Sequence, residues 1–315
     1  MPANLPPQYF EAEKRFREAK TPTDKIDALE DMLAIMPKHK GTDHLKAELR
    51  RRIAKLNQSI DKKIATARAS MVIDKEGAAQ VVVTGLPNAG KSRLVTMLTN
   101  ASPTVADYPF TTHQATPGMM EFENIQIQLI DTPPVTEQAV EWWLPHMLRR
   151  ADAILIMVDL SEAPQPQIET LLSVLENKKV DIYGDKPRSL IVGNKIDRDN
   201  ARRNYDALLC RYGDSLPAAA ISAREGTGLE ELKLKIYRLL DIIRVYTKTP
   251  GQKPDITDPI ILARGSTLAD AAASVHKDFA AGLKFARIWG SGKHDGIMAK
   301  KNHVLEDGDI IELHL

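Results

Sequence analysis

The stretch "GLPNAGKS" (85–92) decides the fold predicted for this chain. It matches the pattern G-x-x-x-x-G-K-[S/T], between an apolar run, "AQVVVTG" (79–85), and a helical pattern that begins at Lys91. The glycines let the backbone curl so that successive N–H groups point at phosphate oxygens. The lysine neutralises phosphate charge, and the serine hydroxyl is a Mg²⁺ ligand. We predict a phosphate-binding loop with Mg²⁺; a chance glycine-rich turn is the alternative, and the loop alone does not separate ATP from GTP.

Apolar runs alternate with helical patterns after this loop. The runs are "IQIQLIDT" (125–132), "ADAILIMVDL" (151–160), "RSLIVGNKID" (188–197) and "PAAAIS" (217–222), and the last helical pattern is "GLEELKLKIYRLLDIIRV" (228–245). Near-continuous apolar strands with intervening helices indicate a mostly parallel sheet covered on both faces. We therefore predict a P-loop α/β domain over residues 77–247.

A second motif, "GNKID" (193–197), predicts which base the site binds. The Asp197 carboxylate accepts two hydrogen bonds from guanine N1–H and N2–H2, and adenine offers no such pair. A site built around buried polar groups rejects an analogue that leaves them unpaired. Asn194 is expected to brace the loop, and the stem of Lys195 to lie over the base. In "ISAREG" (221–226), Ser222 and Ala223 stand where a backbone N–H meets guanine O6, so the three motifs together predict GTP.

The order of motifs resembles that of the Obg-like GTPases, especially the relatives of developmentally regulated GTP-binding proteins. The matching segments are "GLPNAGKS", "DYPFTTHQATPG" (107–118), "DTPP" (131–134), "NKID" (194–197) and "SAR" (222–224). The resemblance implies that "YPFTT" (108–112) is the first switch, in which Thr112 completes the Mg²⁺ shell; a plain surface loop is the alternative. Only 62 residues separate Asp131 from Gly193, so an insertion that many such relatives carry is expected to be absent.

The resemblance and the motifs together define the predicted site. The expected nucleotide contacts are Gly85, Pro87, Asn88, Ala89, Gly90, Lys91, Ser92, Arg93, Asn194, Lys195, Asp197, Ser222, Ala223 and Arg224. The expected metal contacts are Ser92, Thr112 and Asp131, and catalytic roles are assigned to Lys91, Thr112 and Asp131. In potassium-activated GTPases of this kind, an asparagine at the position of Asn88 helps to hold K⁺ beside the phosphates. A residue that only shapes the turn is the equal alternative.

The second switch departs from the usual D-x-x-G motif. Asp131 is retained, but Pro134 stands in place of the glycine whose N–H donates to the γ-phosphate. Proline has no N–H, and Val135 follows where some GTPases carry a water-orienting glutamine. We predict slow intrinsic hydrolysis, on the order of Ras-like intrinsic rates or below. A GTP-dependent scaffold with negligible catalysis is the alternative, and a small-molecule kinase is disfavoured because "NKID" has no role there.

Two further regions flank the predicted GTPase domain. Residues 1–76 are predicted to be helical, with one helix in "TPTDKIDALEDMLAIM" (21–36) and a longer one that together form a hairpin. The apolar stripe of the longer helix is Leu45, Leu49, Ile53, Leu56, Ile60 and Ile64. Residues 248–255 are expected to be a linker. Residues 256–315 resemble a TGS domain, a small β-grasp α+β module, through "GSTLADAAASVHKDFAAGLKFARIWG" (265–290) and "HVLEDGDIIEL" (303–313).

Charge and composition suggest a partner and a compartment. The net charge is +1, yet residues 38–68 hold ten Lys/Arg against three Asp/Glu, which indicates either a phosphate-binding face or a solvated helix. With the basic TGS segment, in which Phe285 and Trp289 are predicted to be core residues, this favours a ribosome or structured RNA as partner. The single cysteine, Cys210, excludes an intramolecular disulfide and is predicted to be buried. No apolar run reaches about 18 residues, so we expect no membrane span and a cytoplasmic protein.

Overall fold

The computed structural model of the chain describes residues 6–19, 22–36, 45–55, 73–99, 115–136, 140–276, 279, 282–290 and 296–314. The chain divides into two compact units, Met1–Val72 and Ile73–Leu315, which are described separately below. Thr112 and the rest of "YPFTT" lie outside the described residues, as do 38–44 and 56–68 of the basic segment. The predictions made for those residues stay predictions.

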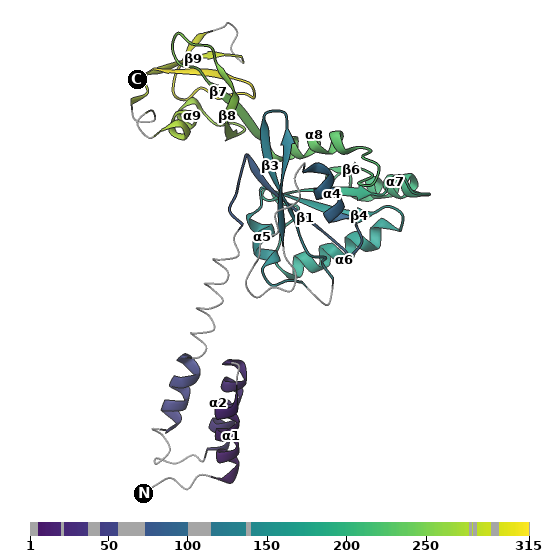
Figure 1. Cartoon of the computed structure of the whole chain (residues 1–315), viewed down its shortest axis with the longest axis vertical. Helices are drawn as coiled ribbons and strands as arrows, with labels where there is room; N and C mark the ends of the chain where they lie inside the picture. Colours follow the sequence, from purple (N-terminus) through teal and green to yellow (C-terminus); the bar gives the residue numbers. More distant parts are fainter. Residues whose placement is uncertain are drawn as a thin grey trace. The chain divides into compact units, whose positions relative to one another are not determined.

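The described residues of the first unit are mainly helical, as predicted. It contains α1 (Pro7–Glu18), α2 (Pro22–Ile35) and a helical segment at residues 45–55 (Figure 1). Leu49 is buried with residues of both helices, and Leu45 and Ile53 pack against the same cluster. The apolar stripe is therefore confirmed where it is described. Helix α1 was not distinguished in the sequence, and it adds Tyr9 to this small core.

The second unit contains a six-stranded sheet with the strand order β2-β3-β1-β4-β5-β6. Its strands are β1 (Ala79–Gly85), β2 (Thr116–Phe122), β3 (Ile125–Asp131), β4 (Ala153–Asp159), β5 (Arg188–Asn194) and β6 (Ala218–Ala220). All are parallel to their neighbours except β2, which is antiparallel to β3. Its helices are α4 (Lys91–Leu98), α5 (Leu144–Arg150), α6 (Pro164–Asn177), α7 (Ala201–Tyr212) and α8 (Leu229–Leu240).

Both faces of this sheet are covered. Helices α4 and α8 share one core cluster with alternate strand residues such as Val81 and Leu155. The residues between them, Val82 and Ile154 among others, point to the opposite face and are equally buried. Helices α5 and α6 lie across the sheet from α8 (Figure 1). The mostly parallel α/β fold predicted from the sequence is confirmed.

A five-stranded sheet with the order β10-β9-β11-β7-β8 follows. Its elements are β7 (Ile242–Thr247), β8 (Asp255–Ala263), α9 (Leu268–Val275), β9 (Phe285–Trp289), β10 (Ile297–Ala299) and β11 (Ile310–His314). Thr267 caps α9 in a capping box with Asp270, which satisfies N–H groups at the helix start. No helix among the described residues is long and apolar enough to span a bilayer.

The structure corrects two secondary-structure predictions. The helical pattern predicted through residue 245 ends at Leu240, where Asp241 adopts a left-handed conformation with φ 52°. The next residues form β7, because alternate apolar side chains such as Ile243 and Val245 enter the core of the small domain. Strand β2 was missed because its sequence, "TPGMMEF", begins with turn-forming residues. Proline is tolerated there because β2 is an edge strand.

Three burial predictions are also wrong. Cys210 is exposed. Helix α7 buries Ala201, Tyr205, Leu208 and Tyr212, and Cys210 is two positions from both Leu208 and Tyr212, which puts it on the opposite side of the helix. Phe285 and Trp289 are only partly buried. Their neighbours on β9, Ala286 and Ile288, enter the core, so the strand's alternation puts the two aromatic rings on the other face of the sheet.

Candidate nucleotide site

The three sequence motifs follow strands that lie side by side in the larger sheet. Strands β1, β4 and β5 are adjacent and parallel, so the loops after Gly85 and Asn194 leave the same edge of the sheet. Ligands of open α/β sheets bind outside this carboxyl edge. The fold therefore brings the phosphate loop, "NKID" and the second switch together at one site.

Backbone geometry explains the phosphate-loop sequence. Gly90 has φ 96°, and a Cβ there would overlap the amide nitrogen of Asn194. A Cβ on Gly85 would lie 2.6 Å from the Met157 carbonyl oxygen, so neither position accepts a side chain without displacement. Asn88 has φ 62°, a left-handed conformation that asparagine adopts more readily than most residues. This geometry supports the turn-shaping role for Asn88 and does not address K⁺.

The phosphate loop and the second switch border one cleft of about 420 Å³. Its lining residues are Pro87, Asn88, Gly90, Lys91, Ser92, Arg93, Asp131, Thr132, Pro133 and Pro134. The ammonium of Lys91 donates to the carbonyl oxygens of Gly85 (3.1 Å) and Leu86 (3.0 Å). Burial lowers the pKa of Lys91, and the charge of Asp131 opposes that shift. The buried ammonium of Lys91 therefore lies at the N-terminus of α4, and both the positive charge and the helix terminus favour binding of an anion such as phosphate.

Asp131 and Ser92 have the chemistry of a Mg²⁺ site. Burial raises the pKa of Asp131, although the Ser92 hydroxyl and the nearby Lys91 favour the charged form. The Oδ1 atom of Asp131 is buried and has no hydrogen-bond partner among the residues that the structure describes, which is costly unless a ligand supplies one. No group of three or more His, Cys, Asp or Glu that could hold a metal occurs in the described part of the chain. Mg²⁺ commonly binds one or two carboxylates together with phosphate oxygens and water, so this pair fits it.

Asn194 connects the loops expected to hold the base. Its side-chain amide donates to the Ala89 carbonyl (2.8 Å) and accepts from the Ala223 N–H (3.0 Å), and the residue is 3% exposed. Arg93 adds a bond from its Nε to the Ala223 carbonyl (3.3 Å). The bracing predicted for Asn194 is thus seen in its contacts. The Ala223 N–H predicted to meet guanine O6 is already bonded to Asn194 here.

Asp197 lies beside the same loop. A hydrogen bond from the Ser222 hydroxyl holds the pKa of Asp197 below its usual value, and the charges of Arg198 and Arg224 act in the same direction. The carboxylate is therefore ionised at neutral pH and able to accept hydrogen bonds. The role of Arg224 in this structure is electrostatic.

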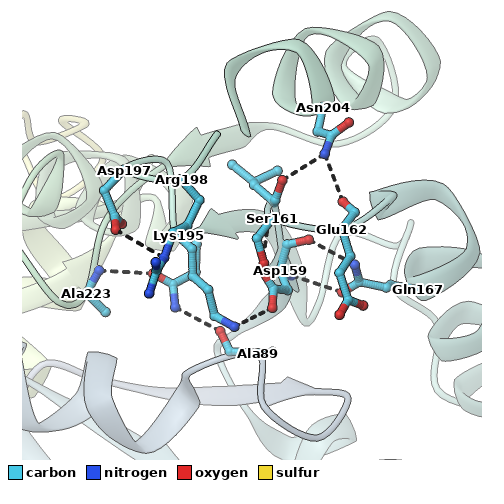
Figure 2. A network of polar contacts seen from close by, with 12 residues as sticks. Ala89, Asp159, Ser161, Glu162, Gln167, Lys195, Asp197, Arg198, Asn204 and Ala223 are labelled. Atoms are coloured by element: carbon cyan, nitrogen blue, oxygen red, sulfur yellow. Dashed lines mark hydrogen bonds and ion pairs between the residues drawn. The ribbon is translucent and has the colours of Figure 1, made fainter. Parts of the chain in front are cut away.

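A polar network around Asp159 was not predicted from the sequence. Its carboxylate pairs with the Lys195 ammonium and accepts from the backbone and hydroxyl of Ser161 (2.9 and 2.6 Å), as Figure 2 shows. Burial raises the pKa of Asp159, but these hydrogen bonds outweigh it and hold the pKa below its usual value. Gln167 and Asn204 bind the loop backbone nearby (Figure 2). The sequence signal that could have indicated this network is the position of Asp159 at the carboxyl end of an apolar strand, which is the ligand-binding edge of such a sheet.

The second switch has little free backbone. The Thr132 backbone N–H favours the charged form of the Asp131 carboxylate and so acts to lower its pKa, and the Thr132 hydroxyl donates to the Val83 carbonyl (2.7 Å). Pro133 and Pro134 have no N–H. The Val135 N–H donates to the Gly85 carbonyl (3.1 Å), and the Val135 side chain is fully buried. From residue 133 to residue 135, each backbone N–H is therefore either absent or bonded.

Fold and site define a P-loop GTPase domain joined to a TGS domain. Residues 80–195 match the family described as 50S ribosome-binding GTPase, and residues 243–315 match the TGS domain family. The second match begins inside β7, in agreement with the strand's place in the smaller sheet.

The resemblance to developmentally regulated GTP-binding proteins is confirmed by relatives that align with 92% of the chain. They include an uncharacterised GTP-binding protein of Methanocaldococcus jannaschii (28% identical, 92% of that protein) and the developmentally regulated GTP-binding protein 2 homologue of Dictyostelium discoideum (27%, 98%). The first alignment spans 361 positions, so the relative carries residues that this chain of 315 lacks. The solved G domain of the Thermotoga maritima FeoB iron transporter is similar over 51% of this chain and 98% of its own, with 27% identity and a TM-score of 0.42. This protein is a GTP-binding protein related to the developmentally regulated GTPases.

Proposed function

We propose that this protein is a Mg²⁺-dependent GTPase switch that acts on ribosomes or structured RNA and hydrolyses GTP slowly without a partner. The observation that carries the nucleotide assignment is the placement of Asn194, which ties the phosphate loop to the "SAR" loop beside Asp197. In this scheme guanine N1–H and N2–H2 donate hydrogen bonds to the ionised Asp197 carboxylate. The phosphates of the nucleotide contact Lys91 and the phosphate-loop backbone.

Each predicted catalytic group has a task in this scheme. Lys91 neutralises β/γ-phosphate charge, and Ser92 and Asp131 would hold Mg²⁺, directly or through water. Bound Mg²⁺ neutralises charge that develops on the transferring phosphate. Slow turnover is expected because residues 133 to 135 have no free backbone N–H to offer the γ-phosphate and Val135 has no polar side chain to orient water. A GTP-dependent scaffold without catalysis remains the competing function, and the same donor shortage favours it.

The outer face of the smaller sheet supports an RNA partner. Phe285, Arg287 and Trp289 alternate along β9 on the face away from the core, and Lys248 lies 4.0 Å from the centre of the Trp289 ring. Within the described chain, Lys284 and Arg287 are exposed and form no ion pair or hydrogen bond through their side chains. Aromatic rings beside the unpaired cations Lys284 and Arg287 suit unpaired bases and phosphates. Lys248 itself is paired with Glu312 (3.4 Å), and the Phe285 ring stacks on His314 (4.6 Å). The description of the matched GTPase family as ribosome-binding also supports this partner.

Co-sedimentation with ribosomal subunits tests the proposal, with a GTP analogue, GDP or no nucleotide. Nucleotide-dependent binding is expected, and it should weaken in the Lys284→Gln/Arg287→Gln variant. The matched control is Lys178→Gln/Lys179→Gln, which removes two exposed cations from the GTPase domain. Equal binding by both variants would argue against this face. Single-turnover hydrolysis with and without ribosomes separates the switch from the scaffold, because only the switch is accelerated.

A further inference from the structure

The β2–β3 hairpin connects the site to the small domain. Strand β2 begins at Thr116, shortly after the predicted first switch, and β3 ends at Asp131 in the second switch. The two strands pair in continuous register, with Thr116 opposite Asp131 at one end and Phe122 opposite Ile125 at the other. At about 3.4 Å per residue, the hairpin is a lever of roughly 20 Å with Asp131 at its base.

The tip of this hairpin is bound by residues of the small domain. The Arg244 guanidinium on β7 pairs with the Glu123 carboxylate and donates to the Asn124 side-chain oxygen (3.3 Å). Asn124 donates to the Tyr246 hydroxyl (2.8 Å) and to the Ile256 carbonyl on β8 (3.0 Å). Two adjacent tip residues thus contact two strands of the other sheet.

Arg244 is itself fixed by the small domain and by helix α8. It donates to both carboxylate oxygens of Asp307 (3.1 and 2.8 Å), and its guanidinium lies 5.1 Å from the centre of the Tyr237 ring. The Tyr237 hydroxyl donates to the same carboxylate (2.9 Å), and its ring stacks on Phe122 at 4.8 Å. With 12% of its side chain exposed, Arg244 is shielded enough from solvent for these contacts to fix its position.

We propose that Arg244 is a positioning residue for GTP hydrolysis, through which the small domain sets the position of Asp131 and the second switch. The inference rests on the proposed function. The two nucleotide states differ where the γ-phosphate meets the second switch, and a tether on the hairpin favours one arrangement of that segment. The contact between the small domain and the hairpin then contributes different free energies to the GTP and GDP states. This difference is what couples the small domain to the nucleotide site. A ligand that displaces the small domain would then alter the nucleotide cycle.

The test compares full-length variants that loosen the tip or a control contact. Glu123→Gln/Asn124→Ala releases the tip and leaves the Arg244–Asp307 contacts in place. Arg264→Gln is the control, because Arg264 pairs with Asp241 (2.9 Å) away from the hairpin and its side chain is 57% exposed, against 60% for Glu123. Affinities for GDP and a non-hydrolysable GTP analogue are measured together with the single-turnover rate. Thermal stability is followed in parallel.

The tip variant is expected to bind GDP within about twofold of the wild type while its preference for the GTP analogue and its hydrolysis rate fall by about fivefold or more. Arg264→Gln should change neither. Arg244→Gln should reproduce the tip variant, and Arg244→Lys should partly restore it because the charge remains.

A tip variant that matches the wild type, or that loses both nucleotides equally, overturns the inference. If Arg244→Gln fails to fold, the tip variant alone decides. A wild-type protein that neither binds nor hydrolyses GTP overturns the proposed function instead, so the two failures are distinguishable.

Discussion

Restoring a backbone N–H at position 134 should accelerate GTP hydrolysis. Pro134 is exposed and lines the cleft, so replacing it removes no buried packing. Both Pro134→Gly and Pro134→Ala supply the missing donor and release the φ angle that proline fixes, and glycine adds more backbone freedom than alanine. The bond from the Val135 N–H to Gly85 is independent of the proline ring and should hold the segment in place.

The expected magnitude follows from one charge-assisted hydrogen bond. Such a bond is worth roughly 1.5–3 kcal/mol, and each 1.4 kcal/mol of transition-state stabilisation is about tenfold in rate. If the bond to the γ-phosphate strengthens only in the transition state, single-turnover hydrolysis should rise about 10- to 100-fold in both variants. Both variants should also lose up to about 1 kcal/mol of folding stability, and Pro134→Gly the more of the two, because the unfolded chain becomes more flexible without the proline ring.

The assay is single-turnover GTP hydrolysis with saturating Mg²⁺, alongside affinities for GDP and a GTP analogue. Pro133→Ala is the positional control, since it adds an N–H one residue before the γ-phosphate donor of the D-x-x-G motif; because Pro133 is buried, the folding stability of this variant is measured alongside. A gain only with glycine would assign the effect to flexibility. Unchanged rates and unchanged GTP/GDP discrimination in both variants would refute the argument that the missing donor limits turnover.

Three further outcomes follow from the site. Asn194→Ala should lower the free energy of unfolding by roughly 2–4 kcal/mol in urea titrations, because it leaves a buried carbonyl and a buried N–H unpaired. Asn204→Ala is the control and should lower it less, because the two hydrogen bonds of Asn204 are less buried. Equal losses of stability in the two variants would contradict the bracing role of Asn194. Asp131→Asn should raise the melting temperature of the nucleotide-free protein at pH 7, because burial raises the pKa of Asp131 and its ionisation therefore costs stability. The gain should vanish below about pH 4, where this carboxyl is protonated in both folded and unfolded chains, and a constant gain across pH would exclude this cause. Turnover in KCl should exceed that in NaCl at equal ionic strength if Asn88 helps to hold K⁺, and equal rates would leave it only a turn-shaping role.

Local sequence was sufficient for the phosphate loop and the parallel strands of the larger domain because their signals are short-range. A phosphate loop needs glycines, a lysine and a serine at fixed spacing, and the predicted run 79–85 coincides with β1. The helix predicted through residue 245 failed for the opposite reason. The apolar residues from 242 to 245 fit the period of a helix as well as that of a strand. Pairing with β8 and β11 of the small domain decides that they form the strand β7.

The sequence by itself determined the nucleotide class, the parallel sheet and the loss of the donor at Pro134, since each depends on residue type at a fixed position. Tertiary structure alone decided that Asp159 holds Lys195, that the Val135 N–H is taken by Gly85, and that Arg244 joins Glu123 to Asp307. These partners are separated by 36 residues for Asp159 and Lys195 and by up to 121 residues for Glu123 and Arg244. No periodicity or spacing encodes such pairs, because the first two exist only once the strands of the larger sheet have assembled, and the contact between Arg244 and Glu123 exists only once the two sheets have folded.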